Sequence, residues 1–383
     1  MAMTIDMADE KRKLGIYIHI PFCRSKCLYC DFCSKPSRDE EKIARYVERL
    51  VWDIKNYKTD VDYAPTDTVY FGGGTPTLMT GEQFAEILSA VRERFEIADG
   101  AEISSECNPR TVDLGKLEAM IAAGVNRLSI GMQSGVDEEL KKLGRAHKFS
   151  DVVHTVKMAR EVGFSNISLD IMYGIPDQTK ESLKETLIKA MGLSPEHLSL
   201  YALKIEEGTP FYKMQDKLIL PDDDTTADMY LEICDYLAKN EYNKYEISNF
   251  SKVGFESRHN LKYWKYDDYI GFGPSAHSFV DDVRIENFPL VDEYISGEDI
   301  VCSATEIERT EQMNEYVMLS MRLATGVDVE VFKEKFGVDF FRIFGEKFKK
   351  FSPEFVRLEN GSCAFTEKGF LVSNYILSEC LQF

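Results

Sequence analysis

Between residues 14 and 203 the chain repeats one pattern: a short apolar run rich in β-branched residues, a loop, and an amphipathic stretch with helical periodicity. The apolar runs predict strands over residues 15–20, 68–71, 101–106, 126–130, 166–171 and 197–201. The amphipathic stretches predict helices over residues 40–57, 81–95, 113–123, 150–162 and 180–191. Strands that alternate with helices of this length pair in parallel through right-handed crossovers.

Residues suited to chemistry follow these predicted strands at their carboxyl ends. A cysteine-rich loop follows the first strand, and a glycine run at 72–74 follows the second. The other four strands end at or near Glu106, Gln133, Asp170 and Ala202. Open parallel sheets and βα barrels both build their sites at this edge, but a barrel brings all six positions to one centre. We therefore predict a six-stranded partial βα barrel within an α/β fold.

The pattern changes after residue 203. A helix is predicted from 221–224 to about 239, followed by an apolar run at 245–250 and an aromatic, glycine-rich segment at 259–279. Further helices are predicted at 306–323, 329–336 and 340–350, with short strands at 356–359 and 363–366 and a last helix. We expect a polar tail over 1–13, the barrel over 14–205, a connecting region over 206–300, and a mainly helical, winged-helix-like domain over 301–383.

Charge and hydropathy restrict the possible partners. Acidic side chains outnumber basic ones by 65 to 46, and the formal net charge is −19. This charge repels a phosphate backbone, so we expect no nucleic-acid partner. No apolar run approaches the ~20 residues that span a bilayer, and the polar N-terminus lacks the apolar core of a secretory signal. We expect a cytoplasmic protein.

Four of the nine cysteines, Cys23, Cys27, Cys30 and Cys33, are clustered, and the other five are scattered. We interpret the scattered five as small buried apolar residues. In the reducing cytosol a cysteine cluster indicates metal binding or catalysis. Cys23, Cys27 and Cys30 offer three thiolates from one loop, which suits a [4Fe-4S] cluster with one iron free of protein ligands.

The free iron of such a cluster can take the amino and carboxylate groups of S-adenosylmethionine. One electron from the cluster then cleaves a carbon–sulfur bond and yields a radical that abstracts hydrogen. The alternative is a zinc site that Cys33 completes. Structural zinc sites usually pair two separate knuckles, whereas these four cysteines share one loop, so we favour the cluster.

The segment YIHIPFC at 17–23, with its CxxxCxxC spacing, resembles the radical S-adenosylmethionine (SAM) superfamily. More narrowly, the chain is similar to the oxygen-independent coproporphyrinogen III oxidase-like (HemN-like) family, from Tyr17 to the FTEKGF segment at 365–370. The resemblance implies a six-stranded partial barrel with a helical C-terminal domain. It also implies a [4Fe-4S] cluster and SAM as cofactors.

The resemblance extends to single residues of a cofactor site. Tyr17 resembles a tyrosine that lies against the cofactor, and Tyr29 occupies the position before the third cysteine. A second group matches the glycine-rich loop at the methionine end and the carboxylate on the first cofactor: Gly73, Gly74, Thr75 and Glu106. A third group matches residues that line a cofactor or substrate pocket: Gln133, Arg145, Asp170 and Ala202. Taken alone, Arg145 could equally lie on a solvated helix end.

Three features favour the haem-chaperone (HemW-like) branch of this family. The segment before Tyr17 is short, Phe32 replaces the cysteine that follows in the oxidase loop, and 259–264 reads HNLKYW, which matches an HNxxYW motif. A histidine with aromatic neighbours suits haem iron, so we take His259 as a candidate iron ligand, against the alternative of a core histidine. His277 is a weaker candidate, and His19 is expected to support the cysteine loop.

The sequence therefore predicts a radical SAM protein that binds haem as cargo and transfers it to acceptor proteins. The acceptor and the electron donor are not specified, and peripheral contact with membrane respiratory proteins is one expectation. The main alternative is an oxidase that converts two propionates of coproporphyrinogen III to vinyl groups. A methyl-transferring relative with the same fold is the second alternative.

Overall fold

The structure is a computed structural model of the chain and describes residues 11–37, 39–297, 300–359 and 361–381. Its main feature is a sheet of 12 strands in the order β14-β13-β12-β11-β1-β4-β5-β6-β7-β8-β10-β9. Six strands run in sequence order and pair in parallel: β1 (Leu14–Ile20), β4 (Thr66–Gly73), β5 (Ile97–Cys107), β6 (Arg127–Gln133), β7 (Asn166–Tyr173) and β8 (His197–Ala202). A doubly wound sheet reverses its strand order at a switch point, so the sequential order confirms the predicted partial barrel.

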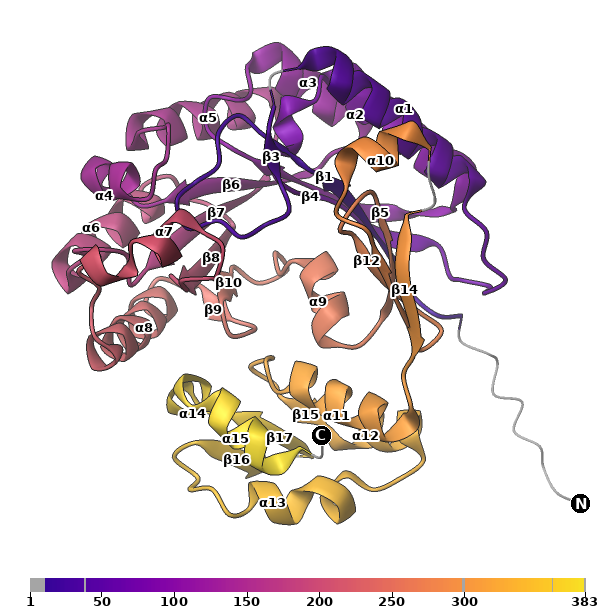
Figure 1. The fold of residues 1–383 in the computed structure, drawn as a ribbon. Helices are drawn as coiled ribbons and strands as arrows, with labels where there is room; N and C mark the ends of the chain where they lie inside the picture. Colours follow the sequence, from indigo (N-terminus) through magenta and orange to yellow (C-terminus); the bar gives the residue numbers. More distant parts are fainter. Residues whose placement is uncertain (1–10, 38, 298–299, 360, 382–383) are drawn as a thin grey trace, which may run out of the picture.

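The helices between these strands cover the convex side of the sheet, where Figure 1 shows them as an outer layer. They are α1 (Glu40–Asn56), α2 (Gly81–Arg94), α3 (Leu114–Ala123), α4 (Asp137–Lys142), α5 (Phe149–Val162) and α6 (Lys180–Met191). Asp39 caps α1 by accepting a hydrogen bond from the Lys42 N–H, and Thr80 and Gln83 form a reciprocal capping box on α2. The short helix α4 escaped prediction because six residues are too few to show a period.

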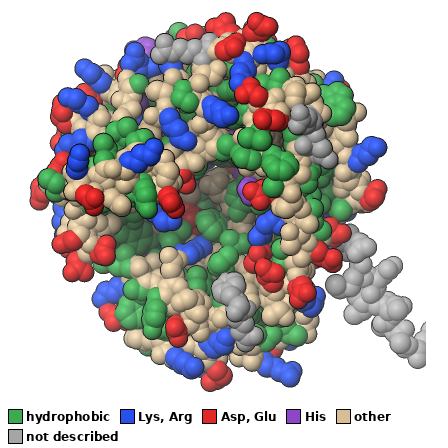
Figure 2. Space-filling view, viewed as in Figure 1, with side chains coloured by type: hydrophobic (Ala, Val, Ile, Leu, Met, Phe, Trp, Pro, Cys, Tyr) green, Lys and Arg blue, Asp and Glu red, His purple; other side chains and the backbone are tan. Residues whose placement is uncertain are grey.

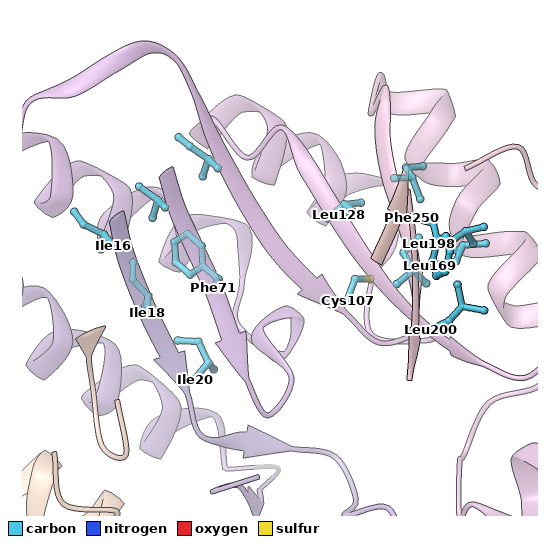
Figure 3. Close-up of a cluster of buried hydrophobic side chains, with 14 of the residues drawn as sticks. Ile16, Ile18, Ile20, Phe71, Cys107, Leu128, Leu169, Leu198, Leu200 and Phe250 are labelled. Atoms are coloured by element: carbon cyan, nitrogen blue, oxygen red, sulfur yellow. The ribbon is translucent and has the colours of Figure 1, made fainter. Parts of the chain in front are cut away.

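Alternate side chains of each strand face the helices and the concave side of the sheet. Figure 3 shows part of the core cluster, with these residues labelled: Ile16, Ile18, Ile20, Phe71, Cys107, Leu128, Leu169, Leu198, Leu200 and Phe250. Parallel strands buried on both faces produce the nearly continuous apolar runs from which the strands were predicted. In β1 this alternation directs the side chains of Tyr17 and His19 to the concave side of the sheet.

Strands from the predicted connecting region, 206–300, extend the sheet at both edges, together with one strand at 301–306, a segment predicted to belong to the C-terminal domain. At one edge β11 (Asp268–Phe272) pairs in parallel with β1, and β12 (His277–Val280), β13 (Val283–Asn287) and β14 (Val301–Glu306) follow as antiparallel strands. At the other edge β10 (Asn249–Ser251) pairs with β8 and with β9 (Asn243–Lys244). The intervening helices are α7 (Pro210–Lys213), α8 (Asp223–Ala238), α9 (Arg258–Trp264) and α10 (Val291–Ser296), with 3-10 turns at Pro76–Leu78 and Gln215–Lys217. The barrel sheet therefore continues past residue 205.

The C-terminal part is mainly helical and carries a small antiparallel sheet, as predicted. Its helices are α11 (Arg309–Ser320), α12 (Val329–Phe336), a π-helical turn (Phe341–Gly345), α13 (Glu346–Phe348), α14 (Glu367–Leu371) and α15 (Ser373–Cys380). The sheet adds an unpredicted strand, β15 (Val327–Asp328), to β17 (Ser362–Phe365) and β16 (Val356–Glu359). Figure 1 shows this part below α9, and backbone hydrogen bonds from Ile247 to Arg322 and from Ala324 to Tyr245 join it to the barrel.

Candidate functional site

A cavity of about 420 Å³ lies at the carboxyl ends of the barrel strands. Figure 2 shows the molecule hollowed on the face that Figure 1 presents, with apolar side chains inside the hollow. The cavity brings together twelve of the residues singled out in the sequence: Cys23, Cys27, Tyr29, Cys30, Gly73, Gly74, Thr75, Glu106, Gln133, Arg145, Asp170 and Ala202. Tyr17 and His259 do not line it. The strand-end positions thus converge on one centre, as a barrel requires.

The cysteine loop is held at both ends and in its middle by the backbone. The two-residue strands β2 (Phe22–Cys23) and β3 (Lys35–Pro36) pair in parallel and close the loop. In the middle, the Leu28 N–H donates to the Leu143 carbonyl, and the Leu28 carbonyl accepts from the Phe211 N–H. These contacts fix the loop over the cavity although its sequence has no helical or strand periodicity.

A chain of hydrogen bonds connects two of the cysteines through side chains behind them. The Arg145 guanidinium lies 3.3 Å from Cys27 Sγ and donates to Asn108 Oδ1 at 2.6 Å. Asn108 Nδ2 in turn donates to Thr75 Oγ1 at 2.7 Å, and that hydroxyl lies 3.5 Å from Cys23 Sγ. Arg145 is therefore directed into the cavity and does not lie on a solvated helix end. Burial, the dominant effect, raises the pKa of the third thiol, Cys30, to about 11.

Asn108 was missed in the sequence, although it follows the third barrel strand by one residue and precedes a proline. Arg127 was also missed: its side chain is only 2% exposed, yet it lines the cavity. Its position as the first residue of β6 did not indicate a role in the site, because an arginine at the start of a strand is usually solvated. Both residues show that a barrel site draws on more positions than the strand ends.

Two enclosed carboxyl groups line the cavity. Burial raises the pKa of Glu106 to about 7, with a further contribution from Asp170, while hydrogen bonds from Tyr70 and the Gly73 N–H act in the opposite direction. Burial also raises the pKa of Asp170, whose Oδ1 accepts a hydrogen bond from Ser129 at 2.8 Å. Both residues line the cavity, where a carboxyl group can accept hydrogen bonds from hydroxyl or amino groups of a ligand.

Gly73 and Gly74, at the end of the second barrel strand, are approached too closely by their neighbours to carry a side chain. Gly73 has φ +108°, and a Cβ there would lie 2.6 Å from the His19 ring. A Cβ on Gly74 would lie 2.5 Å from the Phe22 carbonyl oxygen. Opposite them, Gln133 has a left-handed φ of 63° and accepts a hydrogen bond from Tyr201 at 2.7 Å. The bare backbone at 73–74 forms a cradle beside the cysteine loop.

A second cavity of about 410 Å³ adjoins the first and shares Gly73, Glu106 and Phe32 with it. Its other lining residues are Tyr17, His19, Cys33, Tyr263, Tyr269, Ser275 and His277. Tyr17 donates or accepts a hydrogen bond with His19 Nδ1 at 3.1 Å, and His19 Nε2 lies 3.0 Å from the Cys33 carbonyl oxygen. His19 therefore contacts the cysteine loop directly, and Cys33 faces a different cavity from the other three clustered cysteines.

His259, the candidate iron ligand, is the second residue of α9. Its ring is enclosed, and both ring nitrogens have partners: Thr68 Oγ1 at 2.9 Å and Tyr263 OH at 2.9 Å. The ring also stacks on Tyr70 with centroids 5.2 Å apart. Burial lowers the pKa of His259 to about 3, and Lys262 lowers it further. An iron bond to His259 would require one of these hydrogen bonds to break.

The prediction that the five scattered cysteines are buried is correct for four of them. Cys107, Cys234, Cys363 and Cys380 are buried, as expected for small apolar residues. Cys302 is exposed on the edge strand β14, so the prediction is wrong there. It failed because β14 has no buried residue and covers no core. Within the residues that the structure describes, no helix is long and apolar enough to cross a membrane.

Comparisons with known proteins agree with this geometry. A radical SAM superfamily model matches residues 17–190, and a HemN C-terminal domain model matches residues 307–372. Heme chaperone HemW of Lactococcus lactis is 34% identical over 95% of this chain and 96% of its own length. HemW of Bacillus subtilis is 35% identical over 95% and 98%, and HemW of Escherichia coli is 42% identical over 70% of each chain. The E. coli coproporphyrinogen III oxidase HemN has the same fold, with a TM-score of 0.83 at 24% identity over 97% of this chain and 91% of its own. The chain belongs to the HemW family of HemN-like radical SAM proteins.

Proposed function

We propose that this protein binds haem and transfers it to acceptor proteins, with a radical SAM core as part of the same molecule. The observation that carries this proposal is the near-complete alignment with relatives named heme chaperone, 96% and 98% of whose lengths are matched. The likeness to the oxidase HemN supports a common fold and no more.

Cys23, Cys27 and Cys30 would hold the [4Fe-4S] cluster. Three thiols on one cavity, with the fourth thiol, Cys33, on another, suit a cluster that keeps one iron for a small-molecule ligand. The bound cluster supplies one-electron reduction of SAM. Arg145 and Thr75 would orient two of the thiols through the contacts to Cys27 and Cys23, and Asn108 links them.

The cradle at Gly73 and Gly74 would receive the methionine end of SAM, since the bare backbone lets an ammonium group approach. Thr75 and Tyr29 lie beside it. The carboxyl groups of Glu106 and Asp170 would accept hydrogen bonds from the cofactor, and Gln133, Arg145 and Ala202 complete the wall. Tyr17 would act from the second cavity, where it contacts His19. Because Glu106 is enclosed, cofactor binding would also settle its protonation state.

The reducing environment that free clustered thiols need indicates the cytosol as the working location. We further propose a haem-accepting protein and an electron donor as partners. Peripheral contact with membrane respiratory proteins and the lack of a nucleic-acid partner stay predictions from the sequence.

A paired anaerobic assay tests the function. Purified protein with its cluster intact is expected to take up ferric haem stoichiometrically, measured by difference absorbance at the Soret band. The same preparation, given SAM, reductant and coproporphyrinogen III, is expected to yield no vinyl-bearing product by mass spectrometry. Product formation, or failure to bind haem, would contradict the proposal.

A further inference from the structure

The second cavity has walls suited to a flat aromatic ligand. Tyr17 and His19 project into it from β1, and Tyr269 from β11, the strand paired with β1. Tyr263 meets Tyr269 edge to face, with centroids 4.7 Å apart. Phe32, in the cysteine loop, is 61% exposed although it is large and apolar. A porphyrin face would cover such rings and remove them from water.

His277 differs from most of the described histidines because its ring makes no hydrogen bond. His19, His197 and His259 each have two ring hydrogen bonds, and His147 has one, to the Met132 carbonyl oxygen. Within the described part of the chain only His277 and His154 have no ring hydrogen bond. His154 lies on the helix α5, away from both cavities. His277 therefore combines a free imidazole with a place on a cavity wall.

The position of His277 is fixed although its ring is free. It is the first residue of β12, and its backbone pairs with Glu286 of β13. The preceding turn is held by Asn287, which donates to the Gly273 carbonyl at 2.9 Å. A nitrogen ligand on a rigid strand, facing an aromatic-lined cavity, has the properties of a proximal haem ligand.

We propose that His277, rather than His259, is the protein ligand to haem iron, with the porphyrin in the second cavity against Tyr263, Tyr269 and Phe32. The inference rests on the proposed haem-binding function. An iron bond to His277 breaks no hydrogen bond, whereas one to His259 breaks a buried hydrogen bond and leaves a polar group unpaired.

This placement puts haem beside the candidate cofactor site. Gly73 and Glu106 line both cavities, and Phe32 and Cys33 belong to the loop that carries Cys23, Cys27 and Cys30. Haem and the cluster loop would share a wall.

Titration of the cluster-loaded protein with ferric haem tests the assignment. His277→Ala is expected to weaken haem binding by about tenfold or more and to remove the histidine-ligated signature from the Soret and electron paramagnetic resonance spectra. Added imidazole should restore that signature by entering the vacated space. His154→Ala, which removes the other partner-free histidine, is the matched control and should leave affinity and spectra unchanged.

The outcomes of this experiment distinguish a wrong ligand assignment from a wrong proposed function. Wild-type protein that fails to bind haem would overturn both. If the wild type binds haem and His277→Ala keeps the full spectrum, only the ligand assignment fails. Loss of the signature in His259→Gln or Cys33→Ala, with His277→Ala unaffected, would assign the iron to that residue instead. Thermal unfolding of each variant shows whether a loss reflects misfolding.

Discussion

At the residue scale, the side chains behind the cysteines determine how the thiols are presented. Arg145 and Thr75 contact two different sulfur atoms, and Asn108 bridges them. Such supporting residues fix ligand orientation and commonly change metal affinity by about 10–100-fold when removed. A cluster site in this loop therefore depends on residues that follow β4, β5 and α4, far from the loop in sequence.

Replacement of Cys23, Cys27 or Cys30 by Ala should abolish the brown cluster absorbance, because a cluster cannot stay bound on two thiolates. Cys33→Ala is the matched control from the same loop and should retain iron and absorbance, since its Sγ donates to the Pro289 carbonyl outside the first cavity. Iron and sulfide analysis of anaerobically prepared protein measures both. Loss of iron in Cys33→Ala would return a four-cysteine site to consideration.

Glu106 should make the stability of the cluster-free protein depend on pH. Its pKa is about 7 in the folded protein and about 4.3 in an unfolded chain. The folded state therefore holds a proton that the unfolded state has lost, and stability falls as pH rises through this interval. Between pH 4.5 and pH 7 the loss is at most about 3 kcal/mol. Urea unfolding of Glu106→Gln should show a shallower fall, and parallel curves for both proteins would contradict the assigned pKa.

At the element scale, the residues that could be predicted are those whose position follows from strand periodicity. Gly73 and Gln133 end strands, and Glu106 and Asp170 lie near strand ends, so the pattern alone placed these residues at one edge of the sheet. Asn108 lies one residue beyond a strand end, and no periodicity distinguishes it. The pattern assigns no role to such a residue until the neighbouring strands are in place.

The hydrogen-bond partners of His259 also could not be predicted from the sequence. Its ring nitrogens bond Thr68 of β4 and Tyr263 of α9, and its N–H donates to Glu102 of β5. A motif shows which residues recur together but not whether their polar atoms are already paired. For the same reason the sequence could not show that the ring of His277 makes no hydrogen bond, because this depends on which residues surround it in the folded protein.

Gly73→Ala tests the cradle at the end of β4. The new methyl group would meet the His19 ring and require a left-handed alanine, so SAM affinity and the free energy of unfolding should both fall, the latter by about 1–3 kcal/mol. Gly100→Ala is the matched control: φ is +71° there, but a Cβ would meet nothing within 4 Å. It should lose stability from backbone strain alone and keep SAM affinity, measured by calorimetry. Equal affinity in both variants would exclude a role for the cradle.

At the scale of the whole molecule, the barrel depends on strands from beyond its predicted boundary. β1 lies between β4 and β11, so one of its two hydrogen-bonded edges is completed only by residues 268–272. Nothing in the local pattern of that segment specifies a parallel partner at the other end of the chain. Long-range pairing of this kind escapes sequence reasoning because its partner is set by the global topology.

A fragment that ends at residue 205 should therefore fail to form a stable monomer. It would expose the edge of β1, and an unpaired strand edge promotes association. Size-exclusion chromatography and circular dichroism, with the full chain as control, measure this. A monomeric fragment with cooperative unfolding would show that β1 is stable without β11.

The pairing of β1 with β11 also has a consequence for the order of events on the ribosome. The cysteine loop is synthesised well before the strand that flanks its base, β11, and before the turn at Pro289 that contacts Cys33. N-terminal segments fold first only where their contacts are local. The thiols of this loop are therefore without these contacts until the chain has been extended past residue 289. We expect iron and sulfide to be inserted after chain release, into a loop whose surroundings are already complete.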